Sequence, residues 1–152
     1  YFGENVGDLF VQSSNLKGVN VPLKWITSSI DDLVVIWVAC GLAIGKSYFQ
    51  GISELRLKES DRIKSMSKVL NKLGIKTRSN KDSLKIYGNP NAITKKNIYI
   101  QSHLDHRIAM ASFVAGQVTG NNILIEGFET VSSSFPNFLK LQKKIGAHYE
   151  IT

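Results

Sequence analysis

Apolar residues recur along the chain in four segments that have the spacing of α-helices. Residues 33–44 and 108–118 are nearly continuous apolar runs, which predict buried core helices. Residues 60–73 carry an apolar stripe at helical spacing and a row of lysines on another face, which predicts an amphipathic helix with solvated lysines. Residues 136–145 predict a last helix, because proline is tolerated in a first helical turn.

Short stretches rich in β-branched and aromatic residues separate these helices and predict strands. The expected strands are residues 46–52, 75–78, 83–87, 97–101 and 121–126. The second and third of these strands are expected to form a hairpin. Residues 1–30 are predicted to be strand and loop, with short strands at 8–12 and 19–21, and residues 148–152 to resume a strand.

The predicted elements recur in the same order about 75 residues apart, which indicates an internal repeat. Asp31, an apolar helix, Gly45 and a strand in the first copy correspond to Asp105, an apolar helix, Gly120 and a strand in the second. Two copies of a strand–helix–strand–helix–hairpin unit predict an α/β fold. A length of 152 residues fits one domain with its own core.

The composition narrows the possible partners. A formal net charge of +7 and a pI near 9.5 favour an acidic partner: a phosphorylated metabolite, a nucleic acid or an anionic surface.

Cys40 lies in an apolar run, so we expect a buried structural thiol, and a single cysteine excludes an internal disulfide. The longest apolar run is far shorter than the roughly 20 residues of a membrane-spanning helix. The first residues lack the features of a signal peptide and begin without Met, so we expect a segment of a longer chain.

Three predicted helix entrances carry charged residues that call for a chemical explanation. They are Asp31, the stretch Lys58-Glu59-Ser60-Asp61-Arg62, and Asp105-His106-Arg107. A first helical turn leaves backbone amides unpaired and carries partial positive charge, and an arginine there favours binding of a phosphate or carboxylate. If the repeat brings the three entrances to one edge of the domain, they form one site for an anionic ligand, with carboxylates available for proton transfer.

A purely structural explanation is open for each of these residues. Asp31 and Asp105 fit N-caps of the helices that follow them. Glu59 and Arg62 have the spacing of an ion pair on a helix surface. His106 fits a surface histidine, since a lone histidine is weak evidence for a site.

Three motifs in a fixed order give a family resemblance. L-R-L-K-E-S-D-R-I at residues 55–63, D-H-R-I-A-M-A at 105–111 and S-S-F-P-N-F at 133–138 resemble the carboxy-terminal part of the 3-phosphoshikimate 1-carboxyvinyltransferases (EPSP synthases). The resemblance extends over essentially the whole chain. It implies a domain of repeated βαβαββ units, an inside-out α/β barrel, with about two of three units present here. It also implies an amino-terminal domain that forms the other side of the substrate cleft.

The resemblance implies an activity as well. The enolpyruvyl group of phosphoenolpyruvate is transferred to the 5-hydroxyl of shikimate 3-phosphate, which gives EPSP and inorganic phosphate on the route to chorismate and the aromatic amino acids. The two substrates and the amino-terminal domain are the implied partners, with no nucleic acid and no membrane. The family needs no metal or organic cofactor, and a cytoplasmic enzyme is expected. The segment alone is expected to be inactive.

Individual roles follow from the matched motifs. Asp31 matches the aspartate that binds the shikimate hydroxyls and acts as base on the attacking oxygen. Lys58 matches the lysine that contacts the phosphorylated shikimate, and Glu59 the carboxylate that handles the proton at the methylene carbon of phosphoenolpyruvate. Arg62 and Arg107 match the arginines that clamp the phosphate and carboxylate of phosphoenolpyruvate.

Two further positions belong to the same resemblance. His106 is expected to lie beside these arginines in the substrate site. Ser132-Ser133-Ser134 stands where some members carry a lysine that also contacts phosphoenolpyruvate, so only a hydroxyl is available for that contact. Two other functions are open: a UDP-N-acetylglucosamine enolpyruvyl transferase, which shares the fold, and a non-catalytic basic module that binds nucleic acid.

Overall fold

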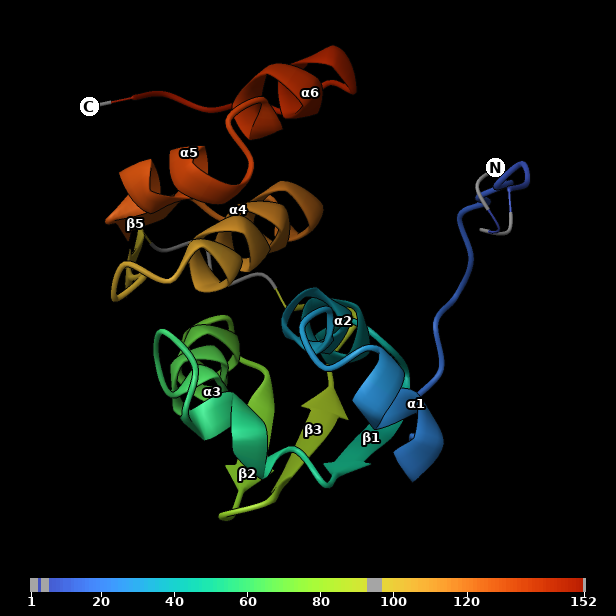
Figure 1. The fold of residues 1–152 in the computed structure, drawn as a ribbon. Helices are drawn as coiled ribbons and strands as arrows, with labels where there is room; N and C mark the ends of the chain where they lie inside the picture. Colours follow the sequence, from blue (N-terminus) through green and yellow to red (C-terminus); the bar gives the residue numbers. More distant parts are fainter. Residues whose placement is uncertain (1–2, 4–5, 93–96, 152) are drawn as a thin grey trace.

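A computed structural model describes residues 3, 6–92 and 97–151 of the chain (Figure 1). The first repeat unit contains the elements α2 (Leu33–Gly41), β1 (Gly45–Gln50), α3 (Arg62–Lys72), β2 (Lys76–Ser79) and β3 (Ser83–Gly88). The three strands form an antiparallel sheet in the order β1-β3-β2. The predicted helices, the strand after Gly45 and the hairpin of this unit are therefore confirmed, with boundaries shifted by a few residues.

The second unit repeats the helix–strand–helix part of this order around a parallel pair of strands, but among its described residues no hairpin follows the last helix. Its elements are β4 (Ile98–Gln101), α4 (His106–Thr119), β5 (Ile123–Glu126), the 3-10 helix η2 (Phe128–Thr130), α5 (Val131–Ser134) and α6 (Phe138–Lys144). β4 pairs in parallel with β5, with Ile98 opposite Ile123. In the first unit the equivalent pairing is reduced to two isolated parallel bridges, Lys17 with Ile44 and Asn20 with Tyr48. The internal repeat is thus visible in the pairing as well as in the element order.

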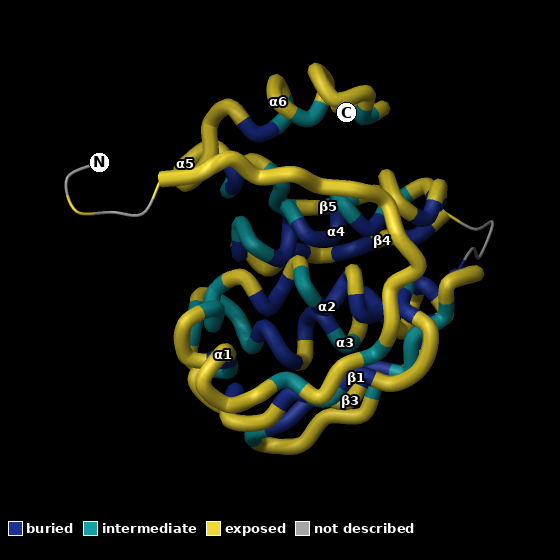
Figure 2. The backbone as a smooth tube through the Cα atoms, turned by 90° about the vertical axis from the view of Figure 1, so that its right-hand side faces the viewer, coloured by how far each residue is buried: buried dark blue, intermediate teal, exposed yellow. Residues whose placement is uncertain are grey.

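Three helices pack together at the centre of the fold. α2 packs against both α3 and α4, and the β1-β3-β2 sheet covers α2 and α3 from one side (Figure 1). Buried positions concentrate where the helices face one another and face the sheet (Figure 2). Trp37 of α2 is fully buried and meets Phe49 of β1 edge-on at 6.0 Å between ring centroids. Because apolar side chains of α2 are buried along nearly its whole length, it needs no polar face.

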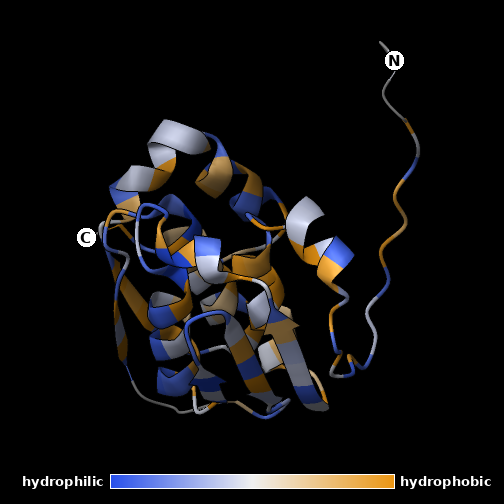
Figure 3. Ribbon diagram, turned by 60° about the horizontal axis from the view of Figure 1, so that its bottom comes forward, coloured by the Kyte–Doolittle hydropathy of each residue, from blue (hydrophilic) through white to orange (hydrophobic). Residues whose placement is uncertain are grey.

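Two strands expected near the amino end did not form. Residues 8–12 form no strand, and Leu9, Phe10 and Val11 are 79% to 89% exposed because no strand lies beside them to pair with their backbone. This segment stands away from the body and carries hydrophobic positions into solvent (Figure 3). Residues 19–21 make only the bridge at Asn20.

The sequence pattern also missed a short helix near the amino end and wrongly predicted a strand at the carboxyl end. Residues 1–30 were expected to hold strands and loops, but the structure has a helix, α1, over Leu23–Ser28 behind Pro22. Pro22 is the N-cap residue of this helix and has an extended backbone conformation. Residues 148–151 are irregular, and residue 152 lies outside the described residues.

Cys40 behaves as expected. Its thiol is buried and forms no disulfide. Burial raises the pKa of the thiol, although a hydrogen bond with Ser47 acts in the opposite direction. A neutral buried thiol is a packing group rather than a nucleophile. None of the helices in the described part of the chain combines the length and the apolar character needed to cross a bilayer.

Candidate active site

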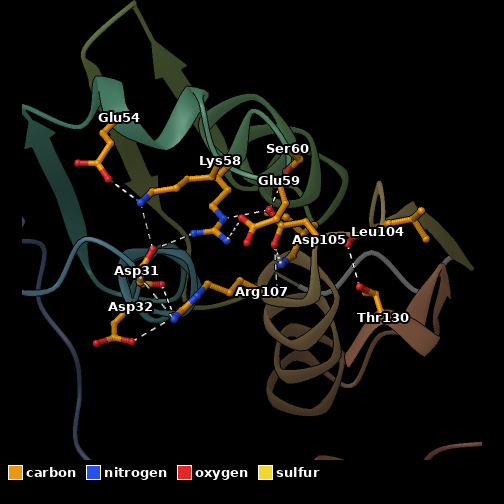
Figure 4. A network of polar contacts seen from close by, with 12 residues as sticks. Asp31, Asp32, Glu54, Lys58, Glu59, Ser60, Leu104, Asp105, Arg107 and Thr130 are labelled. Atoms are coloured by element: carbon orange, nitrogen blue, oxygen red, sulfur yellow. Dashed lines mark hydrogen bonds and ion pairs between the residues drawn. The ribbon is translucent and has the colours of Figure 1, made fainter. Parts of the chain in front are cut away.

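The entrances of α2, α3 and α4 meet at one place on the molecule (Figure 4). Asp31 lies just before α2, Lys58 and Glu59 lie before α3, and Arg107 is in the first turn of α4. Side chains from these three segments form one connected set of ion pairs. The structure therefore brings the three helix entrances together, which was the condition for a single site.

Arg62 is at the centre of this network. Its side chain is 2% exposed, and its guanidinium donates to three carboxylates from three segments. Nε donates to Asp105 Oδ2 at 2.9 Å, Nη1 to Asp31 Oδ1 at 3.0 Å, and Nη2 to Glu59 Oε2 at 2.5 Å. The Glu59–Arg62 pair therefore exists at the expected spacing, but the arginine end is buried, so a simple surface pair is the wrong description.

Asp105 is the fully buried carboxylate of the group, with a relative exposure of 0%. Its Oδ1 accepts from the backbone amides of Arg107 at 3.0 Å and Ile108 at 3.4 Å, which makes it the N-cap of α4 as predicted. Its Oδ2 accepts from Arg62 and from the Ser60 hydroxyl, both at 2.9 Å. Burial by itself raises the pKa of Asp105, but the contacts from Arg62, Ser60 and the Arg107 amide outweigh it and hold the pKa below its ordinary value.

Asp31 has no capping role. The N-cap position of α2 is Asp32, and neither residue's side chain makes a capping hydrogen bond to that helix. Asp31 instead faces three cations: Arg62 at 3.0 Å, Lys58 at 3.8 Å and Arg107 at 4.0 Å. Its side chain remains 46% exposed, so a ligand in solution can reach the carboxylate.

Lys58 bridges two carboxylates at the solvent side of the network. Its Nζ lies 2.5 Å from Glu54 Oε1 and 3.8 Å from Asp31 Oδ1. The hydrogen bond to Glu54 raises the pKa of Lys58, with a smaller contribution in the same direction from Asp31. The sequence pattern did not single out Glu54, which lies in the 3-10 helix η1 (Ser53–Arg56), and its i, i+4 spacing to Lys58 was the available signal.

Arg107 joins α4 to the start of α2. Its Nη1 donates to the backbone carbonyl of Asp31 at 2.6 Å and lies 3.4 Å from Asp32 Oδ1, while its side chain keeps 31% exposure. His106 begins α4 and is half-buried. No hydrogen bond or ion pair of the His106 side chain occurs among the described residues.

The turn before α4 has an uncommon backbone. His103 and Leu104 both lie in the left-handed region, with φ of 56° and 57°. Two side-chain hydroxyls hold this turn: Ser102 Oγ accepts from the Leu104 amide at 3.2 Å and donates to the Gly127 carbonyl at 3.1 Å, and Thr130 Oγ1 donates to the Leu104 carbonyl at 2.8 Å. Consecutive left-handed residues other than glycine are strained and persist where surrounding contacts fix them. Here they set the position of the residue that follows, Asp105.

Comparisons with known proteins identify the family of this chain. The family "EPSP synthase (3-phosphoshikimate 1-carboxyvinyltransferase)" matches residues 3–141. The chain belongs to the EPSP synthase family. A 3-phosphoshikimate 1-carboxyvinyltransferase of Zymomonas mobilis is 41% identical over 152 residues, covering 98% of this chain and 34% of that protein. One of Petrotoga mobilis is 41% identical over 142 residues, covering 93% and 32%.

The EPSP synthase fold is matched as well. The solved EPSP synthase of Acinetobacter baumannii superposes with a TM-score of 0.84 at 36% identity, covering 91% of this chain and 32% of that one. The α/β prediction with repeated units is therefore confirmed. This chain spans about a third of the length of the curated EPSP synthases that it matches.

The serine stretch that departs from the lysine of some EPSP synthases lies in α5. Ser132 Oγ donates to the Glu129 carbonyl at 2.8 Å and Ser133 Oγ to the Thr130 carbonyl at 2.7 Å. Both hydroxyls are therefore engaged within their own helical turn. Serine carries no charge, so this stretch offers no charged contact, and the hydroxyls of Ser132 and Ser133 donate to carbonyls three residues earlier in the chain.

No group of three or more His, Cys, Asp or Glu side chains in the described ranges is arranged to hold a metal ion.

A separate hollow of about 140 Å³ lies between α3 and β4 and is lined in part by Lys68, Lys72 and His103. Lys72 in this hollow donates to the Tyr99 carbonyl at 2.6 Å, so this lysine of α3 is tied to β4. Chemistry is concentrated at the helix entrances, where carboxylates and cations alternate.

Proposed function

We propose that this chain supplies the carboxy-terminal part of the active site of a 3-phosphoshikimate 1-carboxyvinyltransferase. That enzyme would transfer the enolpyruvyl group of phosphoenolpyruvate to the 5-hydroxyl of shikimate 3-phosphate and release inorganic phosphate. The observation that carries the proposal is the convergence of Asp31, Lys58, Glu59, Arg62 and Arg107, from three helix entrances, into one network. Membership of the EPSP synthase family supports it.

The cations are suited to two anionic substrates. Arg62 directs three of its five N–H groups at carboxylates, and Asp31 and Glu59 are about half exposed, so an incoming anion can compete for the outer ones. Arg107 lies on the other side of Asp31 with its guanidinium partly exposed. In the proposal these two arginines bind the phosphate and carboxylate of phosphoenolpyruvate, since guanidinium groups match both anions bidentately. Lys58 binds the phosphorylated acceptor, with His106 next to the arginines.

The carboxylates are suited to the two proton transfers of an addition reaction. The acceptor hydroxyl loses its proton as the oxygen attacks the enol carbon, and the methylene carbon gains one. In the proposal Asp31 takes the proton from the hydroxyl and Glu59 serves the methylene carbon. Both side chains are reachable from solvent, at 46% and 50% exposure.

The second half of the reaction expels phosphate. The carbon–oxygen bond to phosphate breaks, the methyl carbon returns its proton, and the leaving phosphate gains negative charge. Arg62 and Arg107, which bind the phosphate in the ground state, stabilise that charge as it develops. Since Arg62 keeps its contact to buried Asp105 and Arg107 keeps its contact to the Asp31 backbone carbonyl, little reorganisation is required at this step.

In this proposal residues 1–152 belong to a single domain, the carboxy-terminal one of a longer, two-domain cytoplasmic polypeptide, and supply about two of its three repeat units. The remaining substrate contacts come from an amino-terminal domain that closes on the cleft. We therefore expect the segment alone to show no turnover with both substrates.

The test measures phosphate release and EPSP formation by the longer polypeptide with phosphoenolpyruvate and shikimate 3-phosphate. Turnover with this pair, and none when UDP-N-acetylglucosamine replaces shikimate 3-phosphate, is expected. Robust turnover by the isolated segment, or turnover only with the UDP-sugar, would contradict the proposal. Salt-dependent binding of a random oligonucleotide without any response to shikimate 3-phosphate would favour a basic nucleic-acid-binding module instead.

A further inference from the structure

The two oxygens of the Asp105 carboxylate have separate tasks. Oδ1 accepts only backbone amides, from Arg107 and Ile108, and so anchors the first turn of α4. Oδ2 accepts only side-chain donors, Ser60 Oγ and Arg62 Nε. One carboxylate therefore connects the entrance of α3 with the entrance of α4. These are the two entrances that carry the arginines.

The contact at Nε determines which edge of the Arg62 guanidinium is presented outward. A guanidinium is planar, so the hydrogen bond from Nε–H to Asp105 at 2.9 Å restricts the orientation of that plane, while both terminal nitrogens donate to other carboxylates. Those terminal nitrogens face Asp31 and Glu59. Without the Nε contact the guanidinium can rotate about its last torsions, and its outer edge loses that fixed direction.

The three carboxylates around Arg62 differ in whether a ligand can replace them. Asp31 and Glu59 are about half exposed, so an anion arriving from solvent can take their places. The Asp105 side chain has no exposure and its oxygens accept four hydrogen bonds, so it stays in place when the outer partners exchange. The strained turn at His103 and Leu104, tied by Ser102 and Thr130, adds a second constraint on its position.

We infer that Asp105 is a positioning residue for phosphoenolpyruvate binding. It orients the Arg62 guanidinium through Nε and holds the helical turn that carries Arg107, so that both arginines face one ligand. Asp105 does not touch substrate in this role. The inference rests on the proposed function, in which these two arginines bind phosphoenolpyruvate.

The test is Asp105→Asn in the full-length enzyme. The amide oxygen of asparagine still caps α4, because asparagine is as good an N-cap as aspartate. Its NH2 group, however, faces the N–H of Arg62 Nε, so donor opposes donor. We expect kcat/KM for phosphoenolpyruvate to fall on the order of 10²-fold, as for a catalytic group displaced by about 1 Å. KM for shikimate 3-phosphate is expected to change much less.

A matched control lies on the neighbouring helix. Asp61 is the N-cap of α3, accepts from the Lys64 amide at 2.9 Å, and pairs with Arg56 at 2.7 Å, so it has the same chemistry without contact to Arg62. Asp61→Asn is expected to leave both KM values within about twofold, since changes at exposed ion pairs are small. If Asp105 acted only as a helix cap, neither Asp105→Asn nor Asp61→Asn would change the kinetic constants for phosphoenolpyruvate more than those for shikimate 3-phosphate.

Two further variants make the outcome decisive. If Asp105→Asn does not fold, Asp105→Ser keeps an N-cap while removing the acceptor for Arg62, and the same selective loss is expected. Arg62→Ala separates the two levels of the proposal. A loss of phosphoenolpyruvate use in Arg62→Ala without one in the folded Asp105 variants overturns the inference alone. An unchanged Arg62→Ala enzyme overturns the role of Arg62 in the proposed function.

Discussion

Replacing Arg62 with alanine removes the partner of a buried carboxylate, and the cost to stability can be worked from the contacts. Asp105 has no exposure and would keep only Ser60 and two backbone amides as donors. Breaking a buried ion pair from one side costs about 3–5 kcal/mol, because it leaves a desolvated charge. The Asp31 and Glu59 contacts, both about half exposed, add about 0–1 kcal/mol each. We therefore expect Arg62→Ala to lower the free energy of unfolding by about 3–7 kcal/mol.

A double-mutant cycle isolates the pair. In Arg62→Ala/Asp105→Asn the buried residue is neutral, so the penalty for an unpaired charge disappears. We expect the double variant to be more stable than the sum of the single losses predicts by about 2 kcal/mol. Urea unfolding at pH 7 measures the free energy of unfolding of the wild type and the three variants. Far-UV circular dichroism and tryptophan fluorescence should follow the same transition.

The surface pair Arg56–Asp61 is the control for this cycle. Its two charges are 2.7 Å apart but 24% and 30% exposed, so solvent screens them. The cycle of Arg56→Ala and Asp61→Asn is expected to give a coupling of about 0.2–1 kcal/mol. Strictly additive losses for Arg62 and Asp105, or an equal coupling in both cycles, would refute the assignment of Asp105 as a buried charge that depends on Arg62.

Three other predictions follow from the site and its supporting turn. Arg107→Ala in the full-length enzyme should cost about 2–5 kcal/mol in kcat/KM for phosphoenolpyruvate, and an unchanged kinetic profile would remove Arg107 from the site. Gly127→Ala should lower the melting temperature more than Gly120→Ala: both glycines have positive φ, but a Cβ at Gly127 would lie 2.6 Å from Ser102 Oγ while one at Gly120 meets nothing within 4 Å. Equal losses would show that backbone strain alone acts at both. Because the pKa of Asp105 is lowered in the folded state, its contribution to stability is fully present above the unfolded-state pKa of about 4 and is lost as the pH falls below that value toward the folded-state pKa. Unfolding of wild type and Asp105→Asn between pH 7 and about pH 3 should therefore show a stability difference that shrinks with acid, and a constant difference would contradict it.

Much of the fold follows from local patterns in the sequence. The apolar runs at α2 and α4 and the stripe at α3 predict these helices because each pattern matches the period of a helix that must bury one face or all of its surface. The glycines at the helix ends and the order of elements reveal the repeat. The motifs around Lys58 and Arg107 are sufficient to predict the family that the comparisons confirm.

The weakly patterned ends were not predictable in the same way. A run such as Leu9 to Val11 has strand composition, but a strand exists only where another backbone is available to pair with it. α1 is six residues long and lacks an apolar stripe, so periodicity could not find it. In both cases long-range packing overrides a local preference.

Local sequence is enough to place charged residues at the helix entrances, because capping preferences and motif spacing are local properties of the chain. The contacts that these residues make depend on how distant segments pack. The tertiary structure shows Asp31 as an ion-pair partner of Arg62, 31 residues away, where the sequence allowed an N-cap. It shows Asp105 as both a cap and the buried partner of Arg62, 43 residues away. Such pairs form because α2, α3 and α4 pack together, and packing between distant segments leaves no signature in the spacing of the charges themselves.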